Sequence, residues 1–132
     1  PVPEKRGSGT EVSSDEYQVI SQVLQYINVN YTGRLSLAML AQKYNLSASS
    51  MSRMFKKILG QGFAAYVTQV RMRVAEHLLA ENIHTVSQVA DGCGYANIRN
   101  FNRVFKQVHG MTPMAYKEQA KRLLIGEGLH RG

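Results

Sequence analysis

Acidic residues are scarce in this chain: 9 Asp and Glu stand against 16 Lys and Arg, which gives a formal net charge of +7. A net positive charge of this size favours a polyanionic partner, either nucleic acid or an anionic membrane surface. The excess lies in residues 47–125, where eleven Lys and Arg stand against four Asp and Glu, whereas 1–46 and 126–132 are each balanced. We therefore expect residues 47–125 to meet the polyanion.

Cysteine is nearly absent, and the single Cys93 excludes an internal disulfide and fits a reducing compartment. A nucleophilic Cys93 would suggest an enzyme, but its place on the inward side of a short helix favours a buried structural thiol. The four histidines have no metal-ligand spacing, and no Gly-rich phosphate loop is present. Of these histidines, His109 precedes a glycine and is expected to cap a helix or lie on the surface. We expect no metal, no cofactor and no enzymatic activity.

Long apolar runs are also missing, since none approaches the ~18 residues that a membrane-spanning helix needs. No secretory signal is visible. No stretch alternates apolar and polar residues between hairpin turns, so strands are not expected. The sequence therefore predicts an all-α protein of about seven helices.

Three helix beginnings have specific capping patterns. They are Ser13 with Glu16, Thr85 with Gln88, and Thr112 with Pro113. The inward stripe expected of the first helix is Tyr17, Ile20, Leu24, Ile27 and Tyr31. Residues 63–80 contain neither Gly nor Pro and should form one unbroken helix of about 27 Å. The last helix is expected to end at about Leu124.

The chain repeats one pattern twice. SMSRMFKKILG at 50–60 aligns with NFNRVFKQVHG at 100–110, with Arg, Phe-Lys and Gly in matching places. Upstream, Asn45 matches Gly94, and both residue types tolerate the positive φ that a sharp turn between helices needs. Each copy is therefore predicted to be a short helix, a tight turn and a longer helix, which is the helix-turn-helix pattern.

On a helical wheel, each longer helix separates into an apolar arc and a polar arc that contains no acid. The apolar arcs are Met51, Met54, Phe55 and Ile58 in the first copy and Phe101, Val104, Phe105 and Val108 in the second. The outward arcs are Ser49, Ser52, Arg53 and Lys56, and Arg99, Asn102, Arg103 and Lys106. Arg and Asn make bidentate contacts to guanine and adenine in the major groove, and Lys neutralises phosphates. Two matched arcs without acids favour DNA binding over an ordinary solvated face.

Residues 35–118 resemble the DNA-binding domain of AraC/XylS-type bacterial transcription regulators. The most specific stretch is 94–117, GYANIRNFNRVFKQVHGMTPMAYK, with its Gly-aromatic pair, Phe-x-Arg, Phe-Lys, Gly, Thr-Pro and final Tyr. The resemblance implies two helix-turn-helix subdomains. We expect them at 15–81, which includes a linking helix, and at 82–125. The flanking segments are expected to be a linker at 1–14 and a frayed tail at 126–132.

The resemblance also implies how DNA is bound, with one longer helix of each subdomain entering successive major-groove segments. The base-reading residues that it implies are Ser49, Ser52, Arg53, Arg99, Asn100, Asn102 and Arg103. The expected phosphate contacts are Ser47, Lys56, Lys57 and Lys106. The longer helix of the first copy departs from the family pattern by being serine-rich. Its direct readout of bases should therefore rest mainly on Arg53.

The implied partners beyond double-stranded DNA are RNA polymerase and a small-molecule effector. The effector, and dimerisation, are expected to belong to an N-terminal domain absent from this sequence. The expected location is the cytoplasm, on the nucleoid. The alternative is a basic helical module for a membrane surface or a protein partner, in which the amphipathic segment 63–80, with Arg71 and Arg73, would make the contact.

Overall fold

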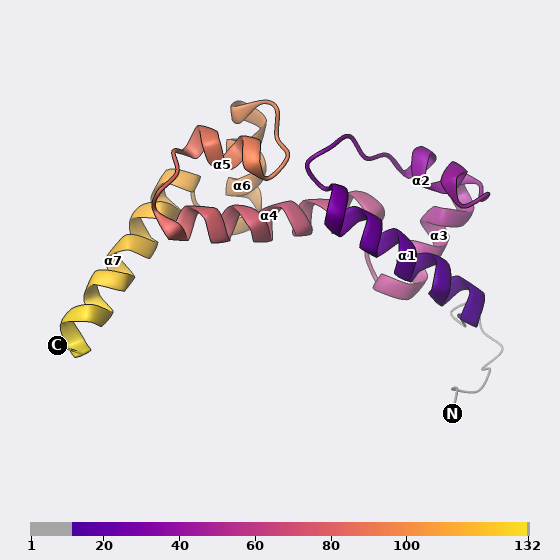
Figure 1. Ribbon diagram of the computed structural model, residues 1–132, viewed down its shortest axis with the longest axis horizontal. Helices are drawn as coiled ribbons and strands as arrows, with labels where there is room; N and C mark the ends of the chain where they lie inside the picture. The colour runs from indigo at the N-terminus through magenta and orange to yellow at the C-terminus, as the bar shows by residue number, and fades with distance from the viewer. Residues whose placement is uncertain (1–11, 132) are drawn as a thin grey trace. The chain divides into compact units, whose positions relative to one another are not determined.

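The computed structural model describes residues 12–131, and within them the chain forms seven α-helices and no strand (Figure 1). The helices are α1 (Ser14–Asn30), α2 (Leu37–Lys43), α3 (Ala48–Leu59), α4 (Phe63–Glu81), α5 (Val86–Gly92), α6 (Ile98–His109) and α7 (Pro113–Arg131). The all-α prediction is confirmed. Most of the linker expected at 1–14 lies outside the described residues.

The chain divides into two compact units, Pro1–Thr68 and Gln69–Gly132. The first holds α1, α2 and α3, and the second holds α5, α6 and α7. The division falls inside α4, which therefore contributes residues to both units. The subdomain expected at 15–81 includes the whole of this helix.

The helices begin where their capping residues predict. Ser13 Oγ accepts a hydrogen bond from the Glu16 backbone N–H at 3.1 Å, and Glu16 accepts one from the Ser13 N–H at 3.1 Å. Thr85 and Gln88 close the same capping box at the start of α5. At α7, Thr112 Oγ1 accepts from the backbone N–H three residues on, at 3.1 Å. Each cap satisfies backbone donors that the first turn leaves without a helical partner.

The repeat is exact in helix length. The short helices α2 and α5 each have 7 residues, and the longer helices α3 and α6 each have 12. Left-handed residues form both turns, with φ of 59° at Asn45 and 100° at Gly94. Left-handed glycines also end both longer helices, Gly60 at φ 74° and Gly110 at φ 75°. The predicted turn chemistry is confirmed in both copies.

The first unit packs α1, α2 and α3 around a small apolar core. Its buried residues are Ile20, Val23, Ile27, Leu40, Ala41, Met51, Met54, Phe55 and Val67. The expected stripe on α1 is partly wrong, because Val23 is fully buried whereas Tyr17 is 57% exposed. At roughly 100° per residue, the buried arc is centred between Ile20 and Val23, which places Tyr17 about 90° away from it.

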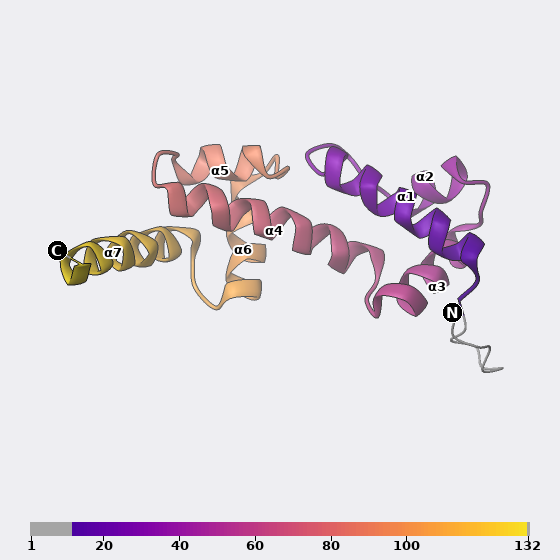
Figure 2. The same ribbon diagram turned by 60° about the horizontal axis from the view of Figure 1, so that its bottom comes forward.

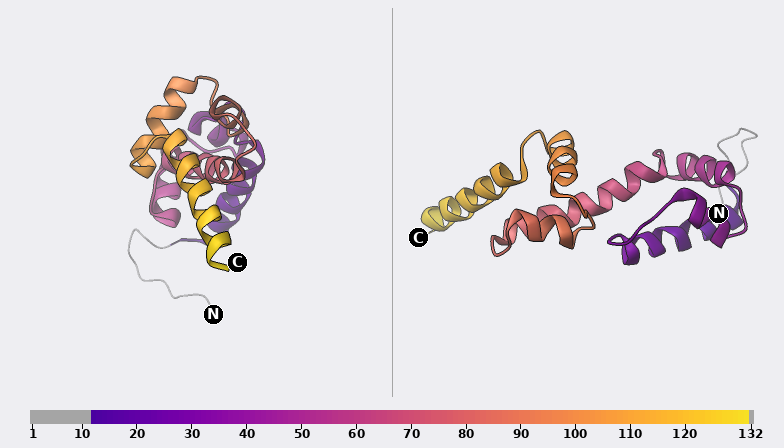
Figure 3. Two further views of the ribbon diagram at one scale, coloured as in Figure 1. Left: turned by 90° about the vertical axis from the view of Figure 1, so that its left-hand side faces the viewer. Right: turned by 90° about the horizontal axis from the view of Figure 1, so that it is seen from above.

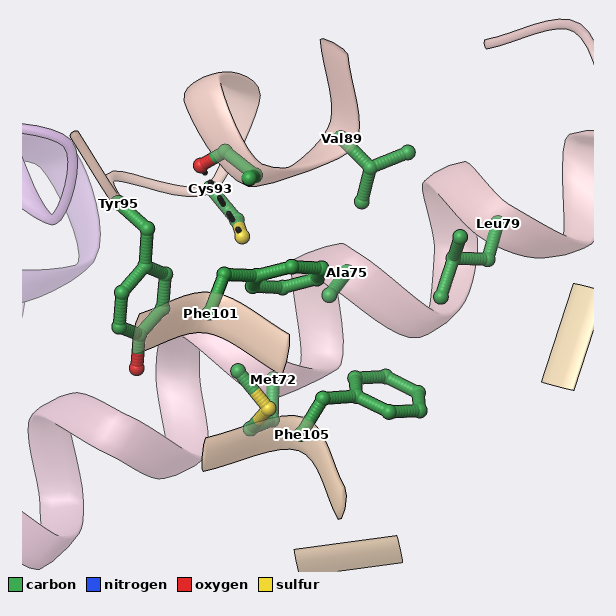
Figure 4. Close-up of a cluster of buried hydrophobic side chains, with 9 residues drawn as sticks. Met72, Ala75, Leu79, Val89, Cys93, Tyr95, Phe101 and Phe105 are labelled. Atoms are coloured by element: carbon green, nitrogen blue, oxygen red, sulfur yellow. Dashed lines mark hydrogen bonds between the residues drawn. The ribbon is translucent and has the colours of Figure 1, made fainter. Parts of the chain in front are cut away.

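The second unit has a core shared by α4, α5 and α6 (Figure 4). It consists of Met72, Ala75, Leu79, Val89, Ala90, Cys93, Tyr95, Phe101 and Phe105. In this unit α5 runs alongside the second half of α4, and α6 crosses that half (Figure 2). Cys93 is fully buried, and its thiol donates to the Ala90 carbonyl at 3.6 Å. Burial raises the pKa of Cys93 to about 12, as expected of a structural thiol.

The last turn of α6 differs from the helical wheel. Val108, expected to face inward, is 53% exposed, whereas the His109 side chain is only 13% exposed. The His109 ring stacks on Phe105 with centroids 3.9 Å apart, and Tyr116 of α7 meets it edge-on at 5.5 Å. A wheel gives only the angle of a residue around its own helix, and here the neighbouring side chains lie on the His109 side. The expected surface position of His109 is therefore wrong, whereas its Nδ1 does lie 3.3 Å from the Phe105 carbonyl oxygen in the last turn of α6.

The start of α7 is fixed to the connection between α4 and α5. Lys117 Nζ donates to the His84 carbonyl at 2.8 Å, and Asn82 Nδ2 donates to the Lys117 carbonyl at 3.2 Å. From there α7 continues as one helix through Arg131, beyond the end expected near Leu124 (Figure 3). No proline follows Leu124, and the glycines at 126 and 128 weaken a helix without necessarily ending it.

Candidate nucleic-acid interface

Each unit exposes one polar face on its longer helix. On α3 the exposed side chains include Ser49, Ser52, Arg53 and Lys56. On α6 they include Arg99, Asn100, Asn102, Arg103 and Lys106. The opposite faces are fixed in the two cores, Met51 and Phe55 in one and Phe101 and Phe105 in the other. Because neither helix contains an Asp or Glu, both faces combine positive charge with hydroxyl and amide groups.

The amino-terminal ends of these faces are held by their caps. Ser47 Oγ accepts from the Ser50 backbone N–H at 3.1 Å. Asn97 Oδ1 accepts from the backbone N–H groups of Arg99 at 2.8 Å and Asn100 at 3.1 Å. Ser47 was expected to contact phosphate, and its hydroxyl proton is still a donor while its oxygen caps α3. Sequence reasoning missed the Asn97 cap, although an Asn directly before a helix is a recognised signal.

The two matched arginines each donate to a side chain on the turn before. Arg53 Nη2 donates to Ser50 Oγ at 3.4 Å. Arg103 Nη2 donates to Asn100 Oδ1 in a short contact. Both arginines stay exposed, and this contact uses only one Nη of each guanidinium, which has five N–H donors. Ser50 was absent from the predicted site, since its hydroxyl has no distinguishing pattern in the sequence.

Lys57 lies apart from the exposed polar face of α3. Its side chain is 22% exposed, and its Nζ contacts both carboxylate oxygens of Glu16 on α1 at 3.2 Å. The hydrogen bond from the Ser13 backbone, with a further contribution from Lys57, lowers the pKa of Glu16. Unlike the exposed Lys56 and Lys106, Lys57 therefore ties α3 to α1 within its own unit.

Residues 12–131 contain neither a candidate metal cluster nor a candidate membrane span. No group of three or more His, Cys, Asp or Glu side chains in residues 12–131 is placed to hold a metal ion. None of the described helices is both long and apolar enough to cross a membrane.

Comparison with known proteins places this geometry in a family. The family model described as a helix-turn-helix domain matches residues 40–119, more than half of the chain. The C-terminal domain of the two-component response regulator YesN from Fusobacterium nucleatum is 30% identical, with a TM-score of 0.72 over 76% of this chain and 98% of that one. A probable AraC family transcriptional regulator from Rhodopseudomonas palustris is 25% identical, with a TM-score of 0.68 over 78% of this chain and 97% of that one.

A curated relative, the bifunctional transcriptional activator and DNA repair enzyme AdaA from Bacillus subtilis, is 31% identical over 90% of this chain and 56% of its own length. Two helix-turn-helix units, each with a basic exposed helix, define the DNA-binding domain of a transcription regulator. The chain belongs to the AraC-type helix-turn-helix family. It spans 14% to 56% of the lengths of three curated relatives that it matches, among them AdaA.

Proposed function

We propose that this protein binds double-stranded DNA sequence-specifically, with α3 and α6 as its recognition helices in successive major-groove segments. The observation that carries the proposal is the pair of matched faces, each exposed, free of acids and fixed by buried apolar residues on the opposite side of its helix. A recognition helix needs this division, because the buried side fixes the orientation and the exposed side meets base edges.

The proposed roles follow the chemistry of each side chain. Base readers are Ser49, Ser52 and Arg53 on α3 and Arg99, Asn102 and Arg103 on α6; Asn100 lies on the same face. Arg pairs with guanine and Asn with adenine, so α6 has the richer reading face. Phosphate contacts are Ser47, Lys56 and Lys106. Lys57 is the weakest phosphate candidate, because its charge is already paired with Glu16.

The linking helix supports a two-groove mode. The 19 residues of α4 form one helix, which spans about 28 Å at 1.5 Å per residue. Successive major-groove segments lie about 34 Å apart on one side of the duplex. One continuous helix, α4, contributes residues to both units and so links the two recognition helices through the chain.

The membrane-surface alternative is not favoured, because the apolar side of α4 is already buried within the protein. Its buried residues are Val67, Val70, Met72, Ala75 and Leu79. Of the two arginines proposed for that role, Arg71 lies over the Tyr95 ring, 5.4 Å from its centroid. An interfacial helix needs a free apolar face to enter the lipid boundary, and α4 has none available in its folded state.

The wider role that we propose is regulation of transcription without enzymatic activity. Its partners would be RNA polymerase and an N-terminal domain that binds a small-molecule effector and dimerises. The support is that curated relatives of this chain are regulators with additional sequence beyond the matched region. The proposed location is the cytoplasm, on the nucleoid, in keeping with a single reduced cysteine.

The test is selection of binding sites from random duplexes, followed by titration of the selected site against salt. We expect one enriched sequence, and log Kd should change linearly with log salt concentration as phosphate contacts are screened. Anionic vesicles of phosphatidylserine serve as the competing polyanion. Enrichment of no sequence, or binding to the vesicles without binding to any duplex, would refute the proposal.

A further inference from the structure

The two recognition helices share an arrangement that the other capped helices lack. In α1 and α5, the third residue of the helix is Glu16 or Gln88, and its side chain reaches back to the cap backbone. In α3 and α6 the same position holds Ser50 or Asn100. There the side chain is instead the acceptor for an arginine three residues further on.

The arrangement has two steps in each copy. The cap side chain, Ser47 or Asn97, first fixes the backbone N–H of the third residue at 3.1 Å. The side chain of that third residue then holds the guanidinium of Arg53 or Arg103. The residue types differ between the copies, but the positions and the direction of the bonds are the same.

We infer that Ser50 and Asn100 are positioning residues, which orient Arg53 and Arg103 for base reading. This inference rests on the proposed function. A free arginine side chain loses much rotamer freedom when it docks on a base. A guanidinium that is already held by one Nη has less freedom to lose. Its remaining donors stay in the fixed planar fork that matches the O6 and N7 acceptors of guanine.

This assignment changes the role of Asn100, which the family resemblance placed among the base readers. A direct adenine reader uses its amide oxygen and nitrogen together against one base edge. The Asn100 oxygen is turned toward Arg103 instead. Asn102 is exposed on the same helix, but no such contact between Asn102 and Arg103 is seen. It is therefore the matched control for Asn100.

The two copies should differ in how firmly they hold their arginines. The Arg53 contact to Ser50, at 3.4 Å, is near the outer limit of a hydrogen bond, and Asn100 is the corresponding acceptor for Arg103. The amide of Asn also extends further from the backbone than the hydroxyl of Ser. Orientation by the third residue should therefore contribute more to base discrimination in α6 than in α3.

The test is a double-mutant cycle on the full chain with Asn100→Ala, Arg103→Ala and the double variant. Kd is measured for the selected duplex and for duplexes changed at each base pair. We expect Asn100→Ala to lower discrimination by about threefold to tenfold, the size of one hydrogen bond, at the base pair that Arg103→Ala affects. In the Arg103→Ala background it should change Kd by less than about twofold, with the salt slope unchanged.

Two further variants make the result specific. Asn100→Ser copies the arrangement of the first unit and should restore part of the discrimination. Asn102→Ala should affect a base pair of its own. The inference is wrong if Asn100→Ala removes discrimination at a separate base pair, or costs as much without Arg103 as with it. If Arg103→Ala itself changes discrimination nowhere, the recognition role of α6 fails instead, and the inference fails with it.

Discussion

His109 Nε2 lies 2.7 Å from Glu76 Oε2, which joins the last residue of α6 to α4. The same imidazole stacks on Phe105 and meets Tyr116 of α7 edge-on. Its Nδ1 lies 3.3 Å from the Phe105 carbonyl oxygen. One side chain at the end of α6 thus contacts residues on three helices of the second unit.

His109→Ala should destabilise the second unit by about 1–3 kcal/mol, because it removes aromatic stacking together with the polar contact to Glu76. The neighbouring Val108→Ala is the matched control. Its side chain is mostly exposed, so the free energy of unfolding should change by less than about 0.5 kcal/mol. Urea denaturation followed by circular dichroism measures both. Equal losses for the two variants would show that the helical wheel, and not the structure, has the correct inward face.

Arg103→Ala should weaken binding to the selected duplex by about 1–3 kcal/mol and relax the preference at one base position. Lys106→Ala, one turn further along α6, should weaken all duplexes alike and lower the salt slope by about one unit. Fluorescence anisotropy with selected and scrambled duplexes separates the two effects. Parent-like binding by both variants would mean that α6 does not enter the groove.

The adjacent lysines of α3 should behave differently from each other. Lys56→Ala removes an exposed charge, so it should lower the salt slope by about one unit and leave stability unchanged. Lys57→Ala breaks the contact with Glu16, so it should cost stability, by up to about 1 kcal/mol for a partly exposed pair, and change the slope less. Thermal unfolding and salt titration are run on both variants. A larger slope change for Lys57→Ala would place that lysine on phosphate.

Glu16→Gln tests the same contact from its other side. Gln can still close the capping box with Ser13, but it loses the charge that Lys57 meets. Because the pKa of Glu16 is lowered in the folded state, its charge stabilises that state above the unfolded pKa, and the contribution is lost as pH falls. The parent should therefore lose its stability advantage over Glu16→Gln under acid conditions. A pH-independent difference in Tm would contradict the ion pair.

Cys93 should make stability depend on pH at the alkaline end. Its pKa rises from 9.0 to about 12, so the folded state keeps a proton that the unfolded chain has lost. Stability should therefore be unaffected below about pH 9 and fall as pH rises toward 12. The difference between the parent and Cys93→Ala isolates this contribution from other groups. In addition, a thiol reagent at pH 8 should label Cys93 only at the rate of unfolding, and rapid labelling of the native protein would contradict its burial.

Local patterns allowed much of this fold to be predicted from the sequence. Capping residues such as Ser13 and Thr85 act on backbone groups within their own first turn. Asn45 and Gly94 occupy turns whose φ values few other residues adopt readily. The repeat then extended each local prediction to a second copy. Such features depend on neighbours in the chain, and these are visible without a structure.

Two contacts that sequence reasoning missed join residues far apart in the chain. The Glu76–His109 pair spans 33 positions, and the Glu16–Lys57 pair spans 41. Neither periodicity nor composition shows which charged side chain will meet another across two helices. For the same reason, a wheel placed Val108 inside, and the charge of Lys57 was assigned to DNA without its partner. The Ser50 contact was missed because a hydroxyl in a serine-rich run has no distinguishing pattern.

The repeat preserves helix lengths, turns and caps, but the two exposed faces have diverged: serines dominate one, and arginine and asparagine the other. If both faces read DNA, the two ends of a bound protomer differ, so the protein binds with a defined direction along the duplex. Inverting the target site would turn the protein around, so that any surface it offers to the transcription machinery would point upstream instead of downstream. A single chain would in this way register the orientation of its site as well as its sequence.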